Sequence, residues 1–425
     1  MPERAEYRDN LYIYPIVYTM ESPLEVTFED TRVAFSYKSD QELRKARFVF
    51  SVVNHPWASA MVAALVKGAL ALRLPIQGLI RKTVFQHFCG GESIESAEST
   101  ILHLANYGVN TILDYSVEGE DSEEDFDRTT QEILHTVQKA RGRKQIPFCV
   151  FKVSGLADAR LLEKVQSGKA VTDDEIQALE RAKGRIDKIC SRAYEYDVPV
   201  LIDAEETWIQ DTVNMLAYEM MERYNKESTI VFITLQMYLT DASKKLKDAY
   251  HMATMHQIYL GVKLVRGAYM EKERERAAEF GHRSPVHPTK EATDDAFNNA
   301  LAFCLDHKQR ISVMCGSHNE YSNYYLTVLM SKHGMRPADE RVWFAQLYGM
   351  SDNISFNLAR AGYNVAKYVP YGPVRSVMPY LFRRAEENTS VYGQSSRELT
   401  LIRKELRRRR GVNEMGMQMY GYISL

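Results

Sequence analysis

Short apolar, β-branched runs alternate with longer amphipathic patterns from about residue 111 onward. The apolar runs lie at residues 111–118, 149–155, 199–206, 229–236, 261–269, 311–319, 342–350 and 364–372. Such nearly continuous apolar runs are typical of strands that are buried on both faces. The segments between them repeat their apolar residues every three or four positions, as helices with one buried face do.

The helical segments also indicate where their helices begin. In "TDDEIQALERAKGRIDKICSRA", Thr172 is a predicted N-cap, and acidic residues occupy the first turn. In "SEEDFDRTTQEILHTVQKA", Ser122 followed by Asp125 resembles a capping box. Eight strands in strict alternation with helices predict an α/β fold, a (β/α)8 barrel. A doubly wound open sheet is the alternative, but no GxGxxG sequence follows any of the predicted strands.

The rest of the chain predicts three parts. Residues 1–100 have a mostly helical and irregular pattern and are expected to pack on the barrel. Residues 101–390 form the predicted barrel, and residues 391–425 form a C-terminal helical tail that contains "IRKELRRRRG". A basic run of this kind is either a solvated helix face or a contact with a membrane or a partner.

Composition narrows the class of protein. The 425 residues include 54 basic and 56 acidic side chains, a formal net charge of −2, which argues against a dedicated nucleic-acid binder. The five cysteines form no CxxC pair, so we expect reduced thiols in a cytosolic setting and no zinc site. The first residues, "MPERAEYRDN", lack the apolar segment of a signal peptide. We therefore expect a cytoplasmic protein.

The most apolar stretch, residues 57–80, bears on contact with a membrane. Lys67 and Arg73 interrupt it, so it falls short of a membrane-spanning helix. It is either a packed helix or a helix that touches a membrane surface. Peripheral contact with the inner face of a membrane therefore stays open.

Polar side chains lie at the carboxyl ends of all eight predicted strands, where barrel enzymes place their chemistry. They are Asp114, Glu118, Lys152, Ser154, Asp203, Glu205, Glu206, Gln236, Lys263, Arg266, Tyr269, His318, Asn319, Gln346, Tyr348 and Tyr368. Any one of them can be structural, and Lys152 beside Asp203 can be only a buried ion pair. Barrel interiors normally hold branched apolar residues, so the concentration favours a site.

The charges in this set narrow the ligand. The cations suit a substrate carboxylate and a phosphate-bearing cofactor, whereas the acids supply counter-charge or meet a substrate amine. No metal-ligand cluster stands out, because His318 has no His or carboxylate at ligand spacing. Neither GxSxG nor a P-loop occurs, which lowers the hydrolase and kinase alternatives.

Two adjacent arginines in "LFRRAEEN" follow the last strand. Neighbouring side chains on a helix point about 100° apart. One of them can therefore be solvated, since Arg383 and Glu387 have the i,i+4 spacing of an ordinary surface pair. Alternatively, Arg383 and Arg384 both converge on an anion that lies over the helix.

Five motifs resemble those of the proline dehydrogenase family over roughly residues 85–390: "IDAEE", "KLVRGAY", "GSHNE", "QLYGM" and "KYVPYGPVRSVMPYLFRRAEEN". The resemblance implies a distorted barrel that binds FAD without a Rossmann motif. It also implies that the last helix lies over the barrel mouth, where Arg383 and Arg384 can hold one substrate carboxylate. A typical barrel would bind phosphate after strands seven and eight, but the family pattern places much of the cofactor contact around strands four to six.

The resemblance implies a role for each matching residue. Lys152 joins the two arginines at the carboxylate, and Tyr269 and Tyr368 enclose the proline ring with Leu264 nearby. Glu118 matches an acid that pairs with the first arginine as a gate. The catalytic positions implied are Asp203, Lys263, Tyr269 and Tyr368. The FAD-binding positions implied are Ala204, Gln236, Arg266, Gly267, Ala268, Thr289, Ser317 and His318.

One departure from the family pattern concerns the flavin contacts. Many bacterial members read "RLVKGAY" where this chain reads "KLVRGAY", so Lys263 replaces an arginine and Arg266 a lysine. Both positions keep a positive charge, but a lysine at position 263 cannot form the two parallel hydrogen bonds of an arginine. The assignment of these two contacts depends on the structure.

The reaction implied is oxidation of L-proline to Δ1-pyrroline-5-carboxylate, with hydride transfer from C5 to FAD and electrons passed to a membrane quinone. Only 35 residues follow Ser390, so we expect the monofunctional type without an aldehyde dehydrogenase module. Hydroxyproline dehydrogenase is an alternative, against which Tyr368 argues because a smaller residue there admits the ring hydroxyl. A flavin barrel that reduces methylenetetrahydrofolate and an inactive barrel with a binding role are further alternatives.

Overall fold

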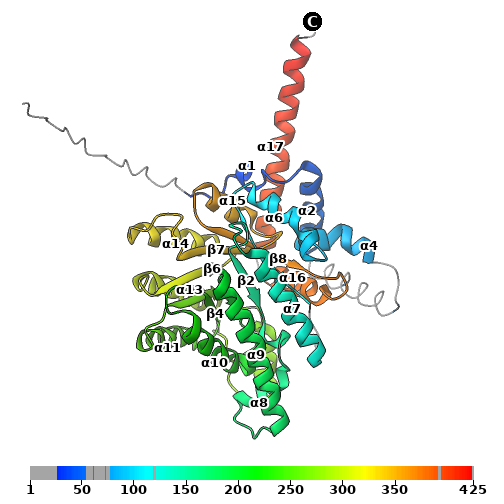
Figure 1. Ribbon diagram of the computed structural model, residues 1–425. Helices are drawn as coiled ribbons and strands as arrows, with labels where there is room; N and C mark the ends of the chain where they lie inside the picture. The colour runs from blue at the N-terminus through cyan, green and yellow to red at the C-terminus, as the bar shows by residue number, and fades with distance from the viewer. Residues whose placement is uncertain are drawn as a thin grey trace, which may run out of the picture.

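The computed structural model describes residues 26–53, 61, 72, 77–117, 121–390 and 394–423. Within these residues, eight parallel strands close into a barrel in chain order (Figure 1). They are β1 (Asn110–Tyr115), β2 (Phe148–Phe151), β3 (Val200–Ile202), β4 (Val231–Gln236), β5 (Leu260–Val265), β6 (Ile311–Gly316), β7 (Val342–Leu347) and β8 (Val365–Tyr371). The pair β1 and β8 closes the barrel. The predicted (β/α)8 barrel is confirmed, and each predicted run overlaps one strand.

Of the helices that surround the barrel, one precedes β1 and the others follow strands. They include α6 (Ile94–Ala105), α7 (Glu123–Ala140), α8 (Ala159–Gln166), α9 (Asp173–Tyr196), α10 (Thr207–Tyr224), α11 (Ala242–Met255), α12 (Met270–Glu279), α13 (Lys290–Asp306), α14 (Glu320–Lys332) and α15 (Asp352–Arg360). Both predicted N-caps are confirmed. The Ser122 hydroxyl oxygen accepts a hydrogen bond from the Asp125 amide at 3.2 Å. Thr172 and Glu175 form a reciprocal capping box.

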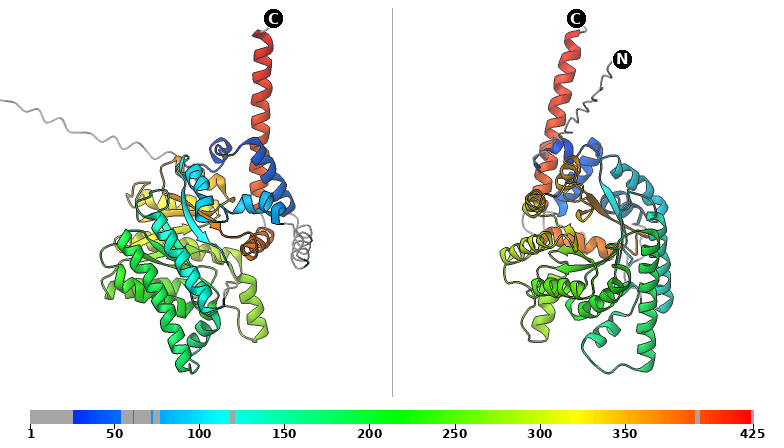
Figure 2. Two further views of the ribbon diagram at one scale, coloured as in Figure 1. Left: turned by 45° about the vertical axis from the view of Figure 1, so that its right-hand side comes forward. Right: turned by 60° about the vertical axis from the view of Figure 1, so that its left-hand side comes forward.

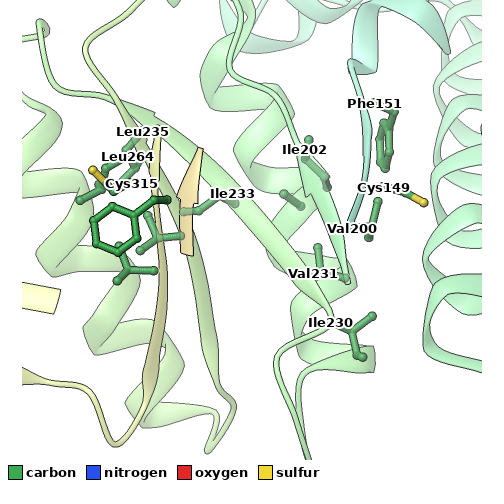
Figure 3. Packing of buried hydrophobic residues seen from close by; sticks show 14 of the residues in the cluster. Cys149, Phe151, Val200, Ile202, Ile230, Val231, Ile233, Leu235, Leu264 and Cys315 are labelled. Carbon is green, nitrogen blue, oxygen red and sulfur yellow. The ribbon is translucent and has the colours of Figure 1, made fainter. Parts of the chain in front are cut away.

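Apolar side chains fill two layers because successive residues of a strand point to opposite faces. The outer layer lies between the strands and the helices and includes Cys149, Val200, Ile202, Leu235 and Leu264 (Figure 3). The inner layer fills the barrel and includes Ile112, Phe148, Leu201 and Phe232. Burying one such aliphatic or aromatic side chain contributes roughly 1.5–3 kcal/mol, so these layers supply much of the stability of the fold.

The described terminal helices pack against each other beside the barrel. Helices α1 (Thr31–Ala34) and α2 (Asp40–Val53) share an apolar cluster with the first half of α17 (Gln394–Ile423). Beyond α2, the red helix α17 extends away from the barrel (Figures 1 and 2). The buried carboxylate of Glu405 accepts hydrogen bonds from Thr31, Arg408 and Arg409. The predicted three-part boundaries stay predictions, but the two terminal parts contact each other.

The helix after β8, α16 (Met378–Ser390), packs with α2 and α17. Three short helical segments, α4 (Gln77–Ile80), η1 (Arg81–Phe85) and α5 (Gln86–Phe88), precede α6. Most of the apolar segment 57–80 lies outside the described residues. Among the residues that are described, no helix has the length and apolar character needed to cross a membrane.

Candidate active site

A cavity of about 630 Å³ lies at the carboxyl ends of the strands, and residues of α16 and α17 also line it. This volume is typical of sites for small molecules and cofactors. The structure brings most of the predicted site residues to its wall: Lys152, Asp203, Ala204, Gln236, Lys263, Arg266, Gly267, Ala268, Tyr269, Ser317, His318, Tyr368, Arg383 and Arg384. Because these residues follow different strands, only closure of the barrel brings them together.

Lys263 points into the barrel from β5, and 5% of its surface is exposed. Its ammonium group donates hydrogen bonds to the carboxylate of Asp203, after β3, and to the hydroxyl oxygen of Tyr368, on β8, which is 2.8 Å away. A buried ammonium group requires such partners because leaving water is costly. Burial raises the pKa of Tyr368 well above its ordinary value, and the carboxylates of Asp203 and Asp114 raise it further. Tyr368 is therefore a neutral phenol held in place by Lys263.

The two adjacent arginines of α16 both line the cavity. Arg384 is nearly buried, and its guanidinium carbon lies 5.1 Å from the centroid of the Tyr380 ring. Burial raises the pKa of Tyr269 well above its ordinary value, nearby carboxylates add to the effect, and the positive charge of Arg383 opposes it. Arg383 and Tyr269 both line this cavity. Together with Lys152, the arginines supply the cations that a carboxylate ligand requires.

Arg266 joins three elements on the β5 and β6 side of the cavity. Its guanidinium group donates hydrogen bonds to the carboxylate of Asp294 at 2.8 Å, to the hydroxyl of Ser317 at 2.8 Å and to the hydroxyl of Ser322 at 3.0 Å. The guanidinium carbon also lies 4.5 Å from the centroid of the Phe297 ring. The five donors of an arginine suit such a fixed position, whereas a lysine would not span these partners.

The chain makes a tight turn beside Arg266. Gly267 has a φ of +139°, and a Cβ there would lie 1.6 Å from the ring of Tyr238. Only glycine can therefore occupy this position. Gln236, at the end of β4, donates to the Glu205 carbonyl oxygen at 2.7 Å, and its own side-chain oxygen accepts from the Ala268 amide at 3.4 Å. These contacts fix the backbone that faces the cavity.

His318 is half-buried in the wall that β6 and β7 share. Its Nδ1 lies 2.9 Å from the hydroxyl oxygen of Ser351, and its Nε2 accepts from the Leu347 amide at 3.5 Å. Burial lowers the pKa of His318 to about 3, so the imidazole is neutral at physiological pH. Because both ring nitrogens already have partners in the protein, the imidazole offers a ligand its shape and no positive charge.

Glu205 is a buried carboxyl group behind the cavity wall. It accepts hydrogen bonds from the hydroxyl of Ser154 and from the Ser154 amide at 3.0 Å, which fixes the turn next to Lys152. Burial raises the pKa of Glu205 to about 7, although the bonds from Ser154 and the charge of Lys152 oppose the increase. Glu205 therefore links the position of Lys152 to β3.

Leu264 lies on the face of β5 opposite the cavity. It is fully buried in the apolar layer between strands and helices, beside Leu235 and Cys315 (Figure 3). The prediction that Leu264 contacts the substrate is therefore corrected, because Lys263 faces the cavity and its neighbour on the strand faces the other way. This alternation could have been read from the sequence.

A second predicted residue, Thr289, does not line the cavity in the part of the chain that is described. Thr289 is exposed, and its hydroxyl caps α13 by accepting from the Ala292 amide at 3.2 Å. The next residue, Lys290, lines the cavity instead. The predicted gate, Glu118, lies outside the described residues.

The structure adds cavity residues that the sequence analysis missed. They include Lys290, Leu347, Ser351, Tyr380, Arg397 and Glu398. Leu347 and Tyr380 stand inside recognised motifs, so the motifs carried a signal for them. For the residues of α17, by contrast, nothing in the sequence indicated a place in the cavity wall, because this segment predicted only a basic helical tail.

The charges on the cavity wall have a positive excess. The cations are Lys152, Lys263, Arg266, Lys290, Arg383, Arg384 and Arg397, and the acids are Asp114, Asp203, Glu320 and Glu398. This balance suits a ligand with net negative charge. Among the described residues, no three His, Cys, Asp or Glu side chains form a group that could hold a metal ion.

Comparison with known proteins identifies relatives. A family model described as "Proline dehydrogenase" matches residues 97–397. The chain is 35% identical over 333 residues to the "Carbapenem antibiotics biosynthesis protein CarD" of Pectobacterium carotovorum subsp. carotovorum, which covers 78% of this chain and 86% of the relative. It is 32% identical over 392 residues to "Proline dehydrogenase 1, mitochondrial" of Arabidopsis thaliana, which covers 82% of this chain and 79% of the relative.

A solved structure supports the fold independently. Proline utilization A (PutA) from Bdellovibrio bacteriovorus, inactivated by N-propargylglycine, matches with a TM-score of 0.67 and 20% identity. The match covers 86% of this chain but 36% of that longer chain. At this identity the likeness establishes the barrel fold and nothing further.

Proposed function

This chain belongs to the proline dehydrogenase family, and from that premise we propose that it oxidises L-proline to Δ1-pyrroline-5-carboxylate, the first step of proline catabolism to glutamate. One observation carries the proposal. A single cavity combines Lys152, Arg383 and Arg384, which suit a substrate carboxylate, with the bonded cluster of Lys263, Asp203 and Tyr368. An amino acid with a small apolar ring matches both features.

FAD is the cofactor that we propose, and the residues around the cavity fit it. The fixed guanidinium of Arg266 and the ammonium group of Lys290 suit a pyrophosphate. The turn at Gly267 lines the cavity with bare backbone, because a Cβ there would collide with the ring of Tyr238. The residues that would hold FAD are Ala204, Gln236, Arg266, Gly267, Ala268, Lys290, Ser317 and His318. When bound, FAD supplies the acceptor for the hydride that leaves C5 of proline.

The protein's own residues position the substrate. Arg383 and Arg384 hold the carboxylate with charge-assisted hydrogen bonds, and Lys152 adds a third cation. Tyr269 and Tyr368 enclose the ring, so that its C5 faces the β4 to β6 side of the cavity. Correct positioning of two reacting groups can contribute several kcal/mol to the reduction of a reaction barrier.

The two tyrosines contribute shape rather than proton uptake. Burial raises the pKa of both hydroxyl groups well above the ordinary value, so both stay protonated at physiological pH. Asp203 is paired with Lys263, which neutralises the charge of the carboxylate next to the substrate. The bond from Lys263 also fixes Tyr368, which favours proline over a hydroxylated ring.

A membrane quinone is the proposed final acceptor of the electrons, with peripheral contact between the protein and a membrane. Family membership supports the acceptor, and a quinone in lipid would require such contact. Turnover with a soluble quinone analogue and with quinone-loaded vesicles tests both parts. Equal rates without any quinone would contradict this part of the proposal.

The visible absorption spectrum of the purified protein, before and after anaerobic addition of L-proline, tests the central proposal. A flavin band that bleaches with L-proline is expected. A band that responds only to hydroxyproline or to a nicotinamide would indicate one of the alternative enzymes. The lack of a flavin band even after addition of FAD would overturn the cofactor assignment and favour an inactive barrel.

A further inference from the structure

The start of α17 forms part of the cavity wall. Arg397 and Glu398 both line the cavity, and 4% of the surface of Glu398 is exposed. Arg397 anchors this turn, because its guanidinium group donates to the Glu320 carboxylate on α14 at 2.9 Å. The next turns pack on α2 through Leu399 and Ile402. A helix expected to be a tail therefore brings a buried carboxyl group to the cavity.

The Glu398 carboxylate accepts a hydrogen bond from the backbone amide of Ser351, in the loop between β7 and α15. Ser351 has a φ of +51° and is almost fully buried. A residue other than glycine adopts this left-handed conformation only at a cost, and it persists where its surroundings hold it. Glu398 satisfies the amide that this conformation turns toward α17.

The side chain of Ser351 connects this contact with His318 in the cavity wall. Its hydroxyl oxygen lies 2.9 Å from Nδ1 of His318. Because the Leu347 amide donates to Nε2, that nitrogen is the acceptor, and Nδ1 carries the proton that is donated to Ser351. A single series of bonds therefore runs from Glu398 through Ser351 to His318, and it fixes the tautomer of the imidazole.

Buried charges surround this series. Asp352 follows Ser351 and pairs with Lys38 at 2.7 Å and with Lys367 of β8 at 3.0 Å. Burial raises the pKa of Glu398 to about 7, and Asp352 adds to the increase, whereas the Ser351 amide and the two lysines oppose it. The N-terminal segment, the barrel and α17 therefore all contribute residues to this buried cluster of charges.

We propose that Glu398 is a positioning residue for the dinucleotide cofactor: through Ser351 it holds the imidazole of His318 at the wall that binds a flavin dinucleotide. This inference rests on the proposed function, since FAD is the ligand considered. Glu398 acts through other residues and is not a catalytic residue. The chain offers a matched control in Glu405, a buried carboxylate on the same helix that is bonded by Thr31, Arg408 and Arg409.

The test is the affinity of the full-length protein for FAD, measured from the rise in flavin fluorescence when the holoprotein is diluted. Loss of one buried hydrogen bond in Glu398→Ala is expected to raise the Kd for FAD about tenfold. Glu398→Gln keeps an oxygen that accepts from the Ser351 amide, so it should restore most of the affinity. Glu405→Ala should lower the thermal midpoint of unfolding and leave the Kd unchanged.

The outcomes separate the inference from the proposed function. If the wild type binds FAD and Glu398→Ala binds it equally well, the inference is overturned and the proposed function stands. The inference is also overturned if Glu405→Ala weakens FAD binding as much as Glu398→Ala does. If the wild type itself binds no FAD, the proposed function fails, and the inference fails with it.

Discussion

The apolar layer outside the barrel and the cavity at its carboxyl end are built from the same strands under different physical rules. On β5, Leu264 is fully buried in the apolar layer, whereas Lys263 points into the barrel and bonds to Asp203 and Tyr368. Apolar packing has no direction, so side chains of similar volume can replace one another at modest cost. A bonded charge depends on its partners, and removing one leaves the other buried and unpaired. Substitutions at neighbouring positions of one strand should therefore affect mainly the stability at one position and mainly the activity at the next.

The largest expected effect comes from removing the buried charge of Lys263 from the cavity side of β5. Lys263→Ala removes the ammonium group that orders Asp203 and Tyr368, and kcat/KM for L-proline should fall by about 10²- to 10³-fold, as when other positioned polar groups in active sites are removed. Anaerobic flavin reduction by proline in a stopped-flow instrument measures the loss. Wild-type reduction rates in the variant would contradict a role for the cluster.

The neighbouring residue supplies the control. Leu264→Ala opens a cavity in the apolar layer and should lower the free energy of unfolding by about 2–5 kcal/mol. The folded variant should keep the wild-type kcat/KM, because the side chain does not face the cavity. Denaturant unfolding and steady-state kinetics measure the two effects. A raised KM for proline in Leu264→Ala would restore the rejected substrate contact.

A second expected effect concerns the adjacent arginines. Arg383→Ala and Arg384→Ala should each raise the KM for L-proline by about 10- to 100-fold, since a hydrogen bond between charged groups contributes roughly 1.5–3 kcal/mol. The value of kcat should change less, because the carboxylate is remote from C5. Arg375, exposed and absent from the cavity wall, is the control. Wild-type kinetics in either cavity variant would show that this arginine does not hold the substrate.

A further expected effect is a pH dependence of the free energy of unfolding, caused by the buried carboxyl group of Glu205. The pKa of Glu205 rises from 4.5 to about 7 on folding, so its protonated form stabilises the fold below pH 4.5 and this contribution is lost as the pH rises through 7. Between pH 4.5 and about 8, the wild type should lose up to about 3 kcal/mol of unfolding free energy relative to Glu205→Gln.

Denaturant unfolding at several pH values measures this difference. Glu206→Gln is the control, because the Glu206 carboxylate pairs with Lys272 at 2.8 Å rather than with buried groups. It should keep most of the pH dependence of the wild type, because burial is the main cause of the raised pKa of Glu205 and the charge of Glu206 adds least. Parallel curves for the wild type and Glu205→Gln would exclude the raised pKa.

The smallest expected effect tests whether the cofactor site includes Lys290 but not its neighbour Thr289. Thr289→Ala removes the N-cap of α13 and should lower the free energy of unfolding by about 1 kcal/mol. The affinity for FAD should stay unchanged, whereas Lys290→Ala should weaken it. Thermal unfolding and flavin fluorescence measure both quantities. A weaker FAD complex in Thr289→Ala would return that residue to the cofactor site.

Much of the cavity could be predicted because its residues stand in motifs at the ends of strands. The structure differs from the prediction where a motif was read without its geometry. Leu264 follows a cavity residue on a strand and must face the other way. Thr289 precedes a cavity residue at a helix start, where a threonine serves as the cap. The alternation on β5 could have been read from the sequence, whereas the path of the chain before α13 is decided by the tertiary structure.

The sequence by itself determined the elements, their order and the ionisable groups at the strand ends, because hydrophobic period, caps and turn residues are local properties. Only the tertiary structure decided which groups meet. Closure of the barrel joins Lys263 to Tyr368 across 105 residues of chain. Packing of the terminal helices brings Glu398 to Ser351. Such contacts depend on how remote segments bury their apolar faces together, and that is a property of the whole chain rather than of any window within it.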